Sequence, residues 1–197
     1  MPARLVLVLG GARSGKSRMA QDIAALAEEA GASICFMATA ADDDPEMVER
    51  INHHRNSRPA SWQTRELVGG VGMPDLAAGI SCGLLDCFTV FLSNTMATKG
   101  LDWPPEDEDL MPESEVLERM RRTEAQALEL VSSLRDRLDT LILVSNEVGM
   151  GVVPPYRLGR IFRDLSGRMN QKLAAQADEV YLVTAGLPLR LKTGEKE

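Results

Sequence analysis

The eight residues Gly10–Ser17, "GGARSGKS", directly follow the apolar run Leu5–Leu9, "LVLVL". An all-apolar run of this length predicts a strand that is covered on both faces. The spacing Gly10-x-x-x-x-Gly15-Lys16-Ser17 matches the P-loop pattern. Because a helix is predicted directly after the loop, the strand–loop–helix context favours nucleotide binding over an ordinary glycine turn.

The P-loop pattern assigns roles to particular side chains. The backbone N–H groups of such a loop surround a phosphate, and the positive end of the following helix attracts it. Lys16 is predicted to reach the β- and γ-phosphates, and the Ser17 hydroxyl to bind Mg²⁺. A second Mg²⁺ ligand is expected at the end of a neighbouring strand. Asp86 is the stronger candidate and Glu147 the competitor, although either carboxylate could instead cap a helix.

Composition and charge limit the classes of function. The chain has 197 residues, 44% of them hydrophobic, which suits one core and a single domain over 1–197. Its net charge of −7 argues against a nucleic-acid partner, and no apolar stretch approaches the roughly 20 residues of a membrane span. The N-terminal apolar run is too short for a secretory signal. The three cysteines lack metal-ligand spacing, so we expect reduced thiols in a cytoplasmic protein.

Strand-like and helix-like patterns alternate along the chain, which predicts an α/β fold with a mainly parallel sheet and helices on both faces. The predicted strands are Leu5–Leu9, Ser33–Met37, Ser61–Glu66, Gly83–Phe88, Leu141–Ser145, Glu179–Val183 and Leu189–Lys192, the last as a C-terminal edge hairpin. The predicted helices are Arg18–Ala30, Asp42–His54, Glu113–Leu138 and Tyr156–Ala177. The acidic, proline-rich stretch Leu101–Glu113 is expected to form a mobile loop.

The two histidines of the chain, His53 and His54, stand side by side among Arg50, Arg55 and Arg58. A neutral imidazole can attack phosphorus, and arginines bind phosphate oxygens. Neighbouring residues on a helix point about 100° apart, so at most one histidine is expected to address a given phosphorus. Two interpretations stay open at this point: a chemical role for one histidine, or phosphate binding and capping for both.

Several segments, taken in order along the chain, resemble one enzyme family. They are "GGARSGKS", "INHHRNSRP" followed by "WQTRE", "LLDC" with "LSN", "LVSNEVGMGVVP", and "FRDLSGRMNQKLAAQADEVYLV". The stretches Asn146–Pro154 and Gly167–Gln171 are much more specific than a P-loop. On these segments the chain resembles the bifunctional adenosylcobinamide kinase/adenosylcobinamide-phosphate guanylyltransferase family of cobalamin biosynthesis.

The resemblance implies a RecA-like P-loop fold and two reactions. In the first, the terminal phosphate of ATP or GTP passes to the hydroxyl of the aminopropanol arm of adenosylcobinamide. In the second, GMP from GTP is added to that phosphate through a guanylyl-histidine intermediate, giving adenosyl-GDP-cobinamide and pyrophosphate. The resemblance implies that His54 is the nucleophile, and it implies a homo-oligomer, of which a trimer with sites between subunits is one form. The implied nucleotide contacts are Gly10, Gly11, Ala12, Arg13, Ser14, Gly15, Lys16, Ser17, Ala38, Thr39, Ala40, Arg55, Asn56, Ser57, Arg58, Glu66 and Asp86.

Two other interpretations use the same residues. A plain P-loop metabolite kinase would need the same loop and Mg²⁺ ligand, with the histidines only binding phosphate, and α-labelled GTP would not label it. A RecA-like, non-catalytic ATP-binding regulator would show no cobinamide-dependent consumption of ATP or GTP. The match over five segments favours the bifunctional enzyme over both.

Overall fold

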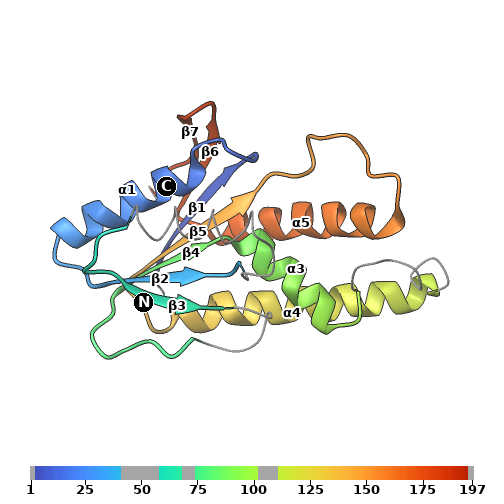
Figure 1. Cartoon of the computed structure of the whole chain (residues 1–197), viewed down its shortest axis with the longest axis horizontal. Coiled ribbons are helices and arrows are strands. Elements are labelled where there is room, and N and C mark those ends of the chain that lie inside the picture. Colours follow the sequence, from blue (N-terminus) through green and yellow to red (C-terminus); the bar gives the residue numbers. More distant parts are fainter. Residues whose placement is uncertain (1–2, 41–57, 68–73, 102–110, 195–197) are drawn as a thin grey trace.

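The computed structural model describes residues 3–40, 58–67, 74–101 and 111–194. Within these residues a seven-stranded sheet has the order β3-β2-β4-β5-β1-β6-β7, and Figure 1 shows helices on both of its faces. The strands are β1 (Arg4–Gly10), β2 (Ile34–Ala38), β3 (Gln63–Glu66), β4 (Cys82–Asp86), β5 (Thr140–Asn146), β6 (Glu179–Thr184) and β7 (Leu187–Lys192). The helices are α1 (Lys16–Glu29), α3 (Phe88–Thr98), α4 (Glu113–Arg135) and α5 (Arg157–Gln176).

The pairing of the strands confirms the predicted fold class. Strands β1 to β6 pair in parallel, and among the described strands β7 alone pairs antiparallel, with β6. The predicted C-terminal edge hairpin is therefore present, and β7 begins two residues before the predicted Leu189. The middle residues of the central strands are apolar because helices cover both faces of the sheet, and the polar residues lie at the strand ends.

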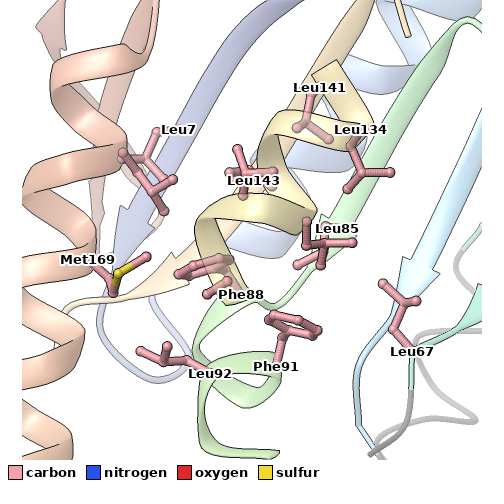
Figure 2. Close-up of a cluster of buried hydrophobic side chains, with 14 of the residues drawn as sticks. Leu7, Leu67, Leu85, Phe88, Phe91, Leu92, Leu134, Leu141, Leu143 and Met169 are labelled. Atoms are coloured by element: carbon pink, nitrogen blue, oxygen red, sulfur yellow. The ribbon is translucent and has the colours of Figure 1, made fainter. Parts of the chain in front are cut away.

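The larger apolar core lies between the sheet and the helices α3, α4 and α5. Figure 2 shows leucines of β1, β4 and β5 pointing toward aromatic and aliphatic side chains of these helices. The labelled members that meet there are Leu7, Leu85, Leu141, Leu143, Phe88, Phe91, Leu92, Leu134 and Met169. A second core fills the other face beneath α1, where the small side chains of Ala20 and Ala24 are fully buried against the sheet.

The predicted strand Gly83–Phe88 is wrong at its end. Strand β4 ends at Asp86, and Phe88 is the first residue of α3, a helix that the sequence analysis does not predict. Asp86 interrupts the apolar run between Leu85 and Cys87, so the sequence does carry a sign of the strand end, and the predicted strand passes over it. The spacing of Phe88, Phe91 and Leu92 is also helical, and all three side chains are buried.

Two other predictions fall on residues that the structure does not describe. The predicted helix Asp42–His54 lies wholly within 41–57, and most of the predicted loop Leu101–Glu113 lies within 102–110. Both stay predictions. None of the helices in the described ranges combines the length and the apolar character needed to cross a membrane.

Candidate functional site

The P-loop joins the end of β1 to the start of α1, as its motif predicts. Gly10 leaves no room for a side chain, because a Cβ there would lie 2.4 Å from Ser14 Oγ and 2.6 Å from the carbonyl oxygen of Val183. Gly15 has a φ of 97°, in the region that favours glycine. The turn is therefore tight, and its backbone geometry requires both glycines.

Hydrogen bonds from two neighbouring segments hold the loop in place. The backbone N–H of Gly186 donates to the Ser14 carbonyl at 2.8 Å, and that of Glu147 donates to the Gly10 carbonyl at 3.1 Å. The Ser14 hydroxyl is buried and has no hydrogen-bond partner within the described residues. A buried polar atom without a partner is costly to the folded state.

Lys16 is buried beside two side chains of the β4–α3 junction. Its Nζ donates to the Gly11 carbonyl at 3.0 Å. Burial lowers the pKa of Lys16, while the nearby Cys87 and Asp86 partly oppose that shift. Burial, with the Asp86 carboxylate adding to it, raises the pKa of Cys87 to about 11, so the thiol is protonated at neutral pH. The structure thus brings Lys16 and Asp86 together.

The register of the strands aligns the predicted contacts at the carboxyl ends of the strands. Ala38 at the end of β2 pairs with Glu66 on one side and with Asp86 on the other. Further along the same edge of the sheet, Asn146 at the end of β5 pairs with Gly10 at the end of β1. Paired residues of neighbouring parallel strands project to the same face of the sheet, and Ala38 packs on the face that α1 covers. Glu66 and Asp86, which pair with Ala38, therefore project to the α1 face as well. Since neighbouring strands are about 4.8 Å apart, Glu66 and Asp86 are separated by about 10 Å across the sheet.

Thr39 ties the end of β2 to the start of α3. Its buried hydroxyl donates to the Cys87 carbonyl at 2.8 Å and accepts from the Cys87 backbone N–H at 2.9 Å. The side-chain amide of Asn94 donates to the Thr39 carbonyl at 3.1 Å. The predicted contact segment Ala38–Ala40 is therefore held beside Asp86 by hydrogen bonds.

A pocket of about 710 Å³ lies at the β3 edge and is lined in part by Arg58, Trp62 and Glu66. The Arg58 guanidinium lies 3.7 Å from the centre of the Phe36 ring. The indole N–H of Trp62 donates to Glu28 at 2.8 Å, and hydrogen bonds from Ser61 and Trp62 lower the pKa of Glu28. The pocket combines a cation, an aromatic ring and a carboxylate, which are groups that can hold a nucleotide.

The remaining predicted site residues divide into two groups. Ser17 is the second residue of α1 and is half-buried at the end of the P-loop. Glu147, the competing Mg²⁺ ligand, accepts a hydrogen bond from the backbone N–H of Gly149 at 2.9 Å. His54, its neighbour His53, and the contacts Arg55, Asn56 and Ser57 lie outside the described residues.

A buried chain of polar side chains behind the site is absent from the sequence analysis. The hydroxyls of Thr89 and Ser145 are 3.1 Å apart, and that of Ser145 donates to Asn170 Oδ1 at 2.7 Å. The backbone N–H of Asn146 donates to Thr89 Oγ1 at 2.6 Å, and Asn170 Nδ2 donates to the Asn146 carbonyl at 3.1 Å. Thr89 of α3 and Asn170 of α5 therefore bind the backbone N–H and the carbonyl of Asn146, the residue that pairs with Gly10 of the P-loop. The sequence signal that could have predicted this chain is the presence of the polar residues Thr89, Ser145 and Asn170 at positions whose neighbours are apolar.

We expect Asn170→Ala to lower the free energy of unfolding by about 2 kcal/mol, because it removes the acceptor of the buried Ser145 hydroxyl and the donor to the part-buried Asn146 carbonyl. Urea denaturation measures the change. Gln171→Ala, an exposed position on the same helix, is the control and should stay within about 0.5 kcal/mol of the original chain. An equally small change for Asn170→Ala would contradict a supporting role for this chain of hydrogen bonds.

A phosphate-binding turn at the carboxyl edge of a mainly parallel sheet places the protein among the P-loop nucleotide-binding proteins. Comparison with known families narrows this class. The model of the family described as cobinamide kinase/cobinamide phosphate guanyltransferase matches residues 6–191. The chain belongs to this family, and the resemblance seen in its motifs is confirmed.

Three relatives match nearly the whole chain. The bifunctional adenosylcobalamin biosynthesis protein CobU of Salmonella typhimurium is 40% identical over 95% of this chain and 99% of its own length. The protein of the same description from Escherichia coli is 37% identical over the same shares. The bifunctional adenosylcobalamin biosynthesis protein CobP of Pseudomonas aeruginosa is 39% identical over 94% of this chain and 96% of its own length. Among solved structures, the flagellar accessory protein FlaH of Methanocaldococcus jannaschii aligns with a TM-score of 0.48 at 12% identity, over 98% of this chain and 80% of that one.

Proposed function

We propose that this protein phosphorylates adenosylcobinamide with ATP or GTP and then transfers GMP from GTP to adenosylcobinamide phosphate. The products of the second step are adenosyl-GDP-cobinamide and pyrophosphate. The observation that carries the proposal is the glycine loop between β1 and α1 with its buried Lys16, in a chain of the cobinamide kinase family. We also propose that the chain is a single domain that works in the cytoplasm as a homo-oligomer, with a trimer as one form and no nucleic-acid partner.

In the kinase step the substrate hydroxyl attacks the γ-phosphorus, and the bond between the γ-phosphorus and the β–γ bridging oxygen breaks. Catalysis of such a transfer depends mainly on positioning and on stabilising charge. The backbone of Gly10–Ser17 and the Lys16 ammonium hold the β- and γ-phosphates. A buried ammonium interacts more strongly with phosphate than an exposed one, because little water screens it.

The donor set beside Lys16 fits Mg²⁺, which prefers oxygen ligands and keeps several waters and phosphate oxygens. The Ser17 hydroxyl and the Asp86 carboxylate would hold the ion. Asp86 is close enough to Lys16 to oppose the lowering of its pKa, and this proximity supports the proposed ligand role of the carboxylate. When bound, Mg²⁺ neutralises charge that develops on the β- and γ-oxygens.

In the guanylyl step a nitrogen of His54 attacks the α-phosphorus of GTP and pyrophosphate leaves. An oxygen of adenosylcobinamide phosphate then attacks the same phosphorus, and the phosphorus–nitrogen bond breaks. With an ordinary pKa near 6.5, a histidine is mostly neutral at neutral pH and can act as the nucleophile. The pocket that Arg58 and Glu66 line supports nucleotide binding beyond the P-loop, since it offers a cation for phosphate and a carboxylate for base N–H groups.

Asp86→Asn should raise the Mg²⁺ concentration needed for half-maximal phosphorylation by about tenfold or more, because a carboxylate binds Mg²⁺ more strongly than a neutral amide does. The measurement is activity as a function of Mg²⁺ concentration, with circular dichroism to show that the fold persists. Glu147→Gln is the matched control and should leave the profile unchanged. The reverse result would transfer the ligand role to Glu147.

The proposed function is tested by two labelled nucleotides. With γ-labelled ATP, Mg²⁺ and adenosylcobinamide, the label should appear in the corrinoid. With α-labelled GTP and Mg²⁺ but no corrinoid, the label should stay on the protein through denaturing separation. Adenosylcobinamide phosphate, added to the native labelled protein, should remove it. A plain metabolite kinase gives no protein label, and a non-catalytic ATP-binding regulator gives neither result.

A further inference from the structure

Residues 148–156, between β5 and α5, form an exposed segment that we term the apolar loop. Met150 is 79% exposed, Val152 95%, Val153 56% and Tyr156 49%. No residue from 148 to 156 is charged, although the chain as a whole carries a net charge of −7. Apolar side chains gathered on one exposed segment commonly mark a binding surface.

Specific contacts hold the apolar loop in its conformation. Arg160 of α5 donates from Nη1 to the carbonyls of Pro154 at 3.1 Å and Pro155 at 2.7 Å. A Cβ on Gly159 would lie 2.7 Å from both Pro154 Cβ and Tyr156 Cε2, so the end of the loop packs directly on the helix backbone. These contacts fix the C-terminal end of the apolar loop from Pro154 to Tyr156, so a ligand that binds there finds the backbone already ordered.

The apolar loop is continuous with the phosphate cradle. Figure 1 shows it leaving the carboxyl end of β5 and running outward past the edge of the sheet to the outer end of α5. At its start, the backbone N–H of Glu147 donates to the Gly10 carbonyl at 3.1 Å. Met150 comes four residues after Asn146, so their Cα atoms are at most about 14 Å apart. A ligand lying on the loop could therefore extend a side arm to the cradle.

We propose that the apolar loop binds the corrin macrocycle of adenosylcobinamide, with the aminopropanol arm directed toward the P-loop. This inference rests on the proposed function and names the surface that holds its acceptor substrate. A corrin ring is a broad plate with methyl groups on its rim and neutral amides on its side arms. An uncharged apolar surface suits the methyl-lined face of such a plate, because no charged side chain of the loop has to lose its water when the ring is bound.

The size of the surface favours a small molecule over a second copy of the chain. A stable protein–protein interface buries about 800 Å² on each partner. The four exposed side chains belong to one segment of nine residues, which is far less than the 20 to 30 residues that each side of such an interface uses. The surface of one loop is enough for a macrocycle, which is much smaller than a protein partner.

The test is the double variant Met150→Glu/Val152→Glu, which places two charges where the ring is proposed to lie. Leu187→Glu/Leu189→Glu on the edge strand β7 is the matched control, since both leucines are similarly exposed. The loop variant should raise the KM for adenosylcobinamide by about tenfold or more, because burying an unpaired carboxylate against the ring is unfavourable. Its KM for the nucleotide should not change, and the control variant should match the original chain in both constants.

Equilibrium dialysis of adenosylcobinamide, followed by its visible absorption, gives a second readout that requires no turnover. Weaker binding by the loop variant alone supports the proposal. An unchanged KM and unchanged binding overturn it, as does a fall in the mass of the assembly with loss of nucleotide binding, which would assign the loop to a subunit contact. If the original chain binds adenosylcobinamide but does not phosphorylate it, the proposed function fails while the dialysis still decides this inference.

Discussion

Lys16→Ala should reduce both phosphoryl transfer and guanylyl transfer by at least about 10²-fold, because both reactions need the triphosphate held in the same cradle. The lysine is buried at the start of α1, next to Asp86 and within 3.0 Å of the Gly11 carbonyl. No other lysine of the sequence lies within the P-loop motif to replace it. The measurement is the initial rate of each reaction at saturating corrinoid.

The stability of this variant provides the control. Burial lowers the pKa of Lys16, which means that the folded state disfavours its charged form. Removing the ammonium should therefore leave the midpoint of thermal unfolding unchanged or raise it. Lys172→Ala removes a lysine that pairs with Glu124 on the surface, and it should leave both reactions intact. Near-normal activity of Lys16→Ala in either reaction would show that a second nucleotide site exists.

His54→Ala should abolish covalent labelling by α-labelled GTP and guanylyl transfer, while phosphorylation of adenosylcobinamide persists. The γ-phosphoryl group passes directly to the substrate hydroxyl, so that step needs no protein nucleophile. Guanylyl transfer is proposed to pass through a phosphorus–nitrogen bond, and without the imidazole that bond cannot form. Labelling after denaturing separation and the rate of each half-reaction measure the two effects separately.

His53→Ala is the matched control, because it removes the same side chain one position away. It should keep the label, with turnover reduced at most by weaker phosphate contacts. The adduct of the original chain should be labile to acid and stable to base, as a phosphorus–nitrogen bond is and a phosphate ester is not. If His53→Ala loses the label and His54→Ala keeps it, the nucleophile is His53. Normal labelling of the double variant would exclude the histidine mechanism.

The local sequence is sufficient to predict the nucleotide cradle. The apolar run, the glycines and the helix pattern after Ser17 are contiguous, and a tight turn between a strand and a helix depends on residues that are neighbours in the chain. The structure places β1, the loop and α1 in that order, with Gly10 and Gly15 where backbone geometry requires them. The alternation of strand and helix patterns likewise predicts the mainly parallel sheet.

The junction after β4 shows where local patterns fail. Apolar residues lie on both sides of Asp86, with Leu84 and Leu85 before it and Cys87 and Phe88 after it, and the predicted strand continues through to Phe88. Whether such a residue continues a strand or begins a helix depends on what it packs against. Phe88 meets Phe91 and the core beneath α4, with their ring centres 6.2 Å apart. The two rings belong to the same helix, but the core that buries them is complete only after α4 has packed onto the sheet.

Strand order and register decide which residues meet at the site. Both depend on pairing between strands that are far apart in the sequence. Glu66, Asp86 and Asn146 are separated by many residues in the chain, yet each ends a strand at the same edge of the sheet. The polar chain from Thr89 to Asn170 joins three elements that periodicity treats independently. Exposure of Met150 and Val152 could not be predicted either, because an apolar residue in a loop is buried or exposed according to what packs over it. Local chemistry therefore determined that this protein holds a phosphate, whereas hydrogen bonding between distant strands decided which carboxylates and which apolar surface stand beside it.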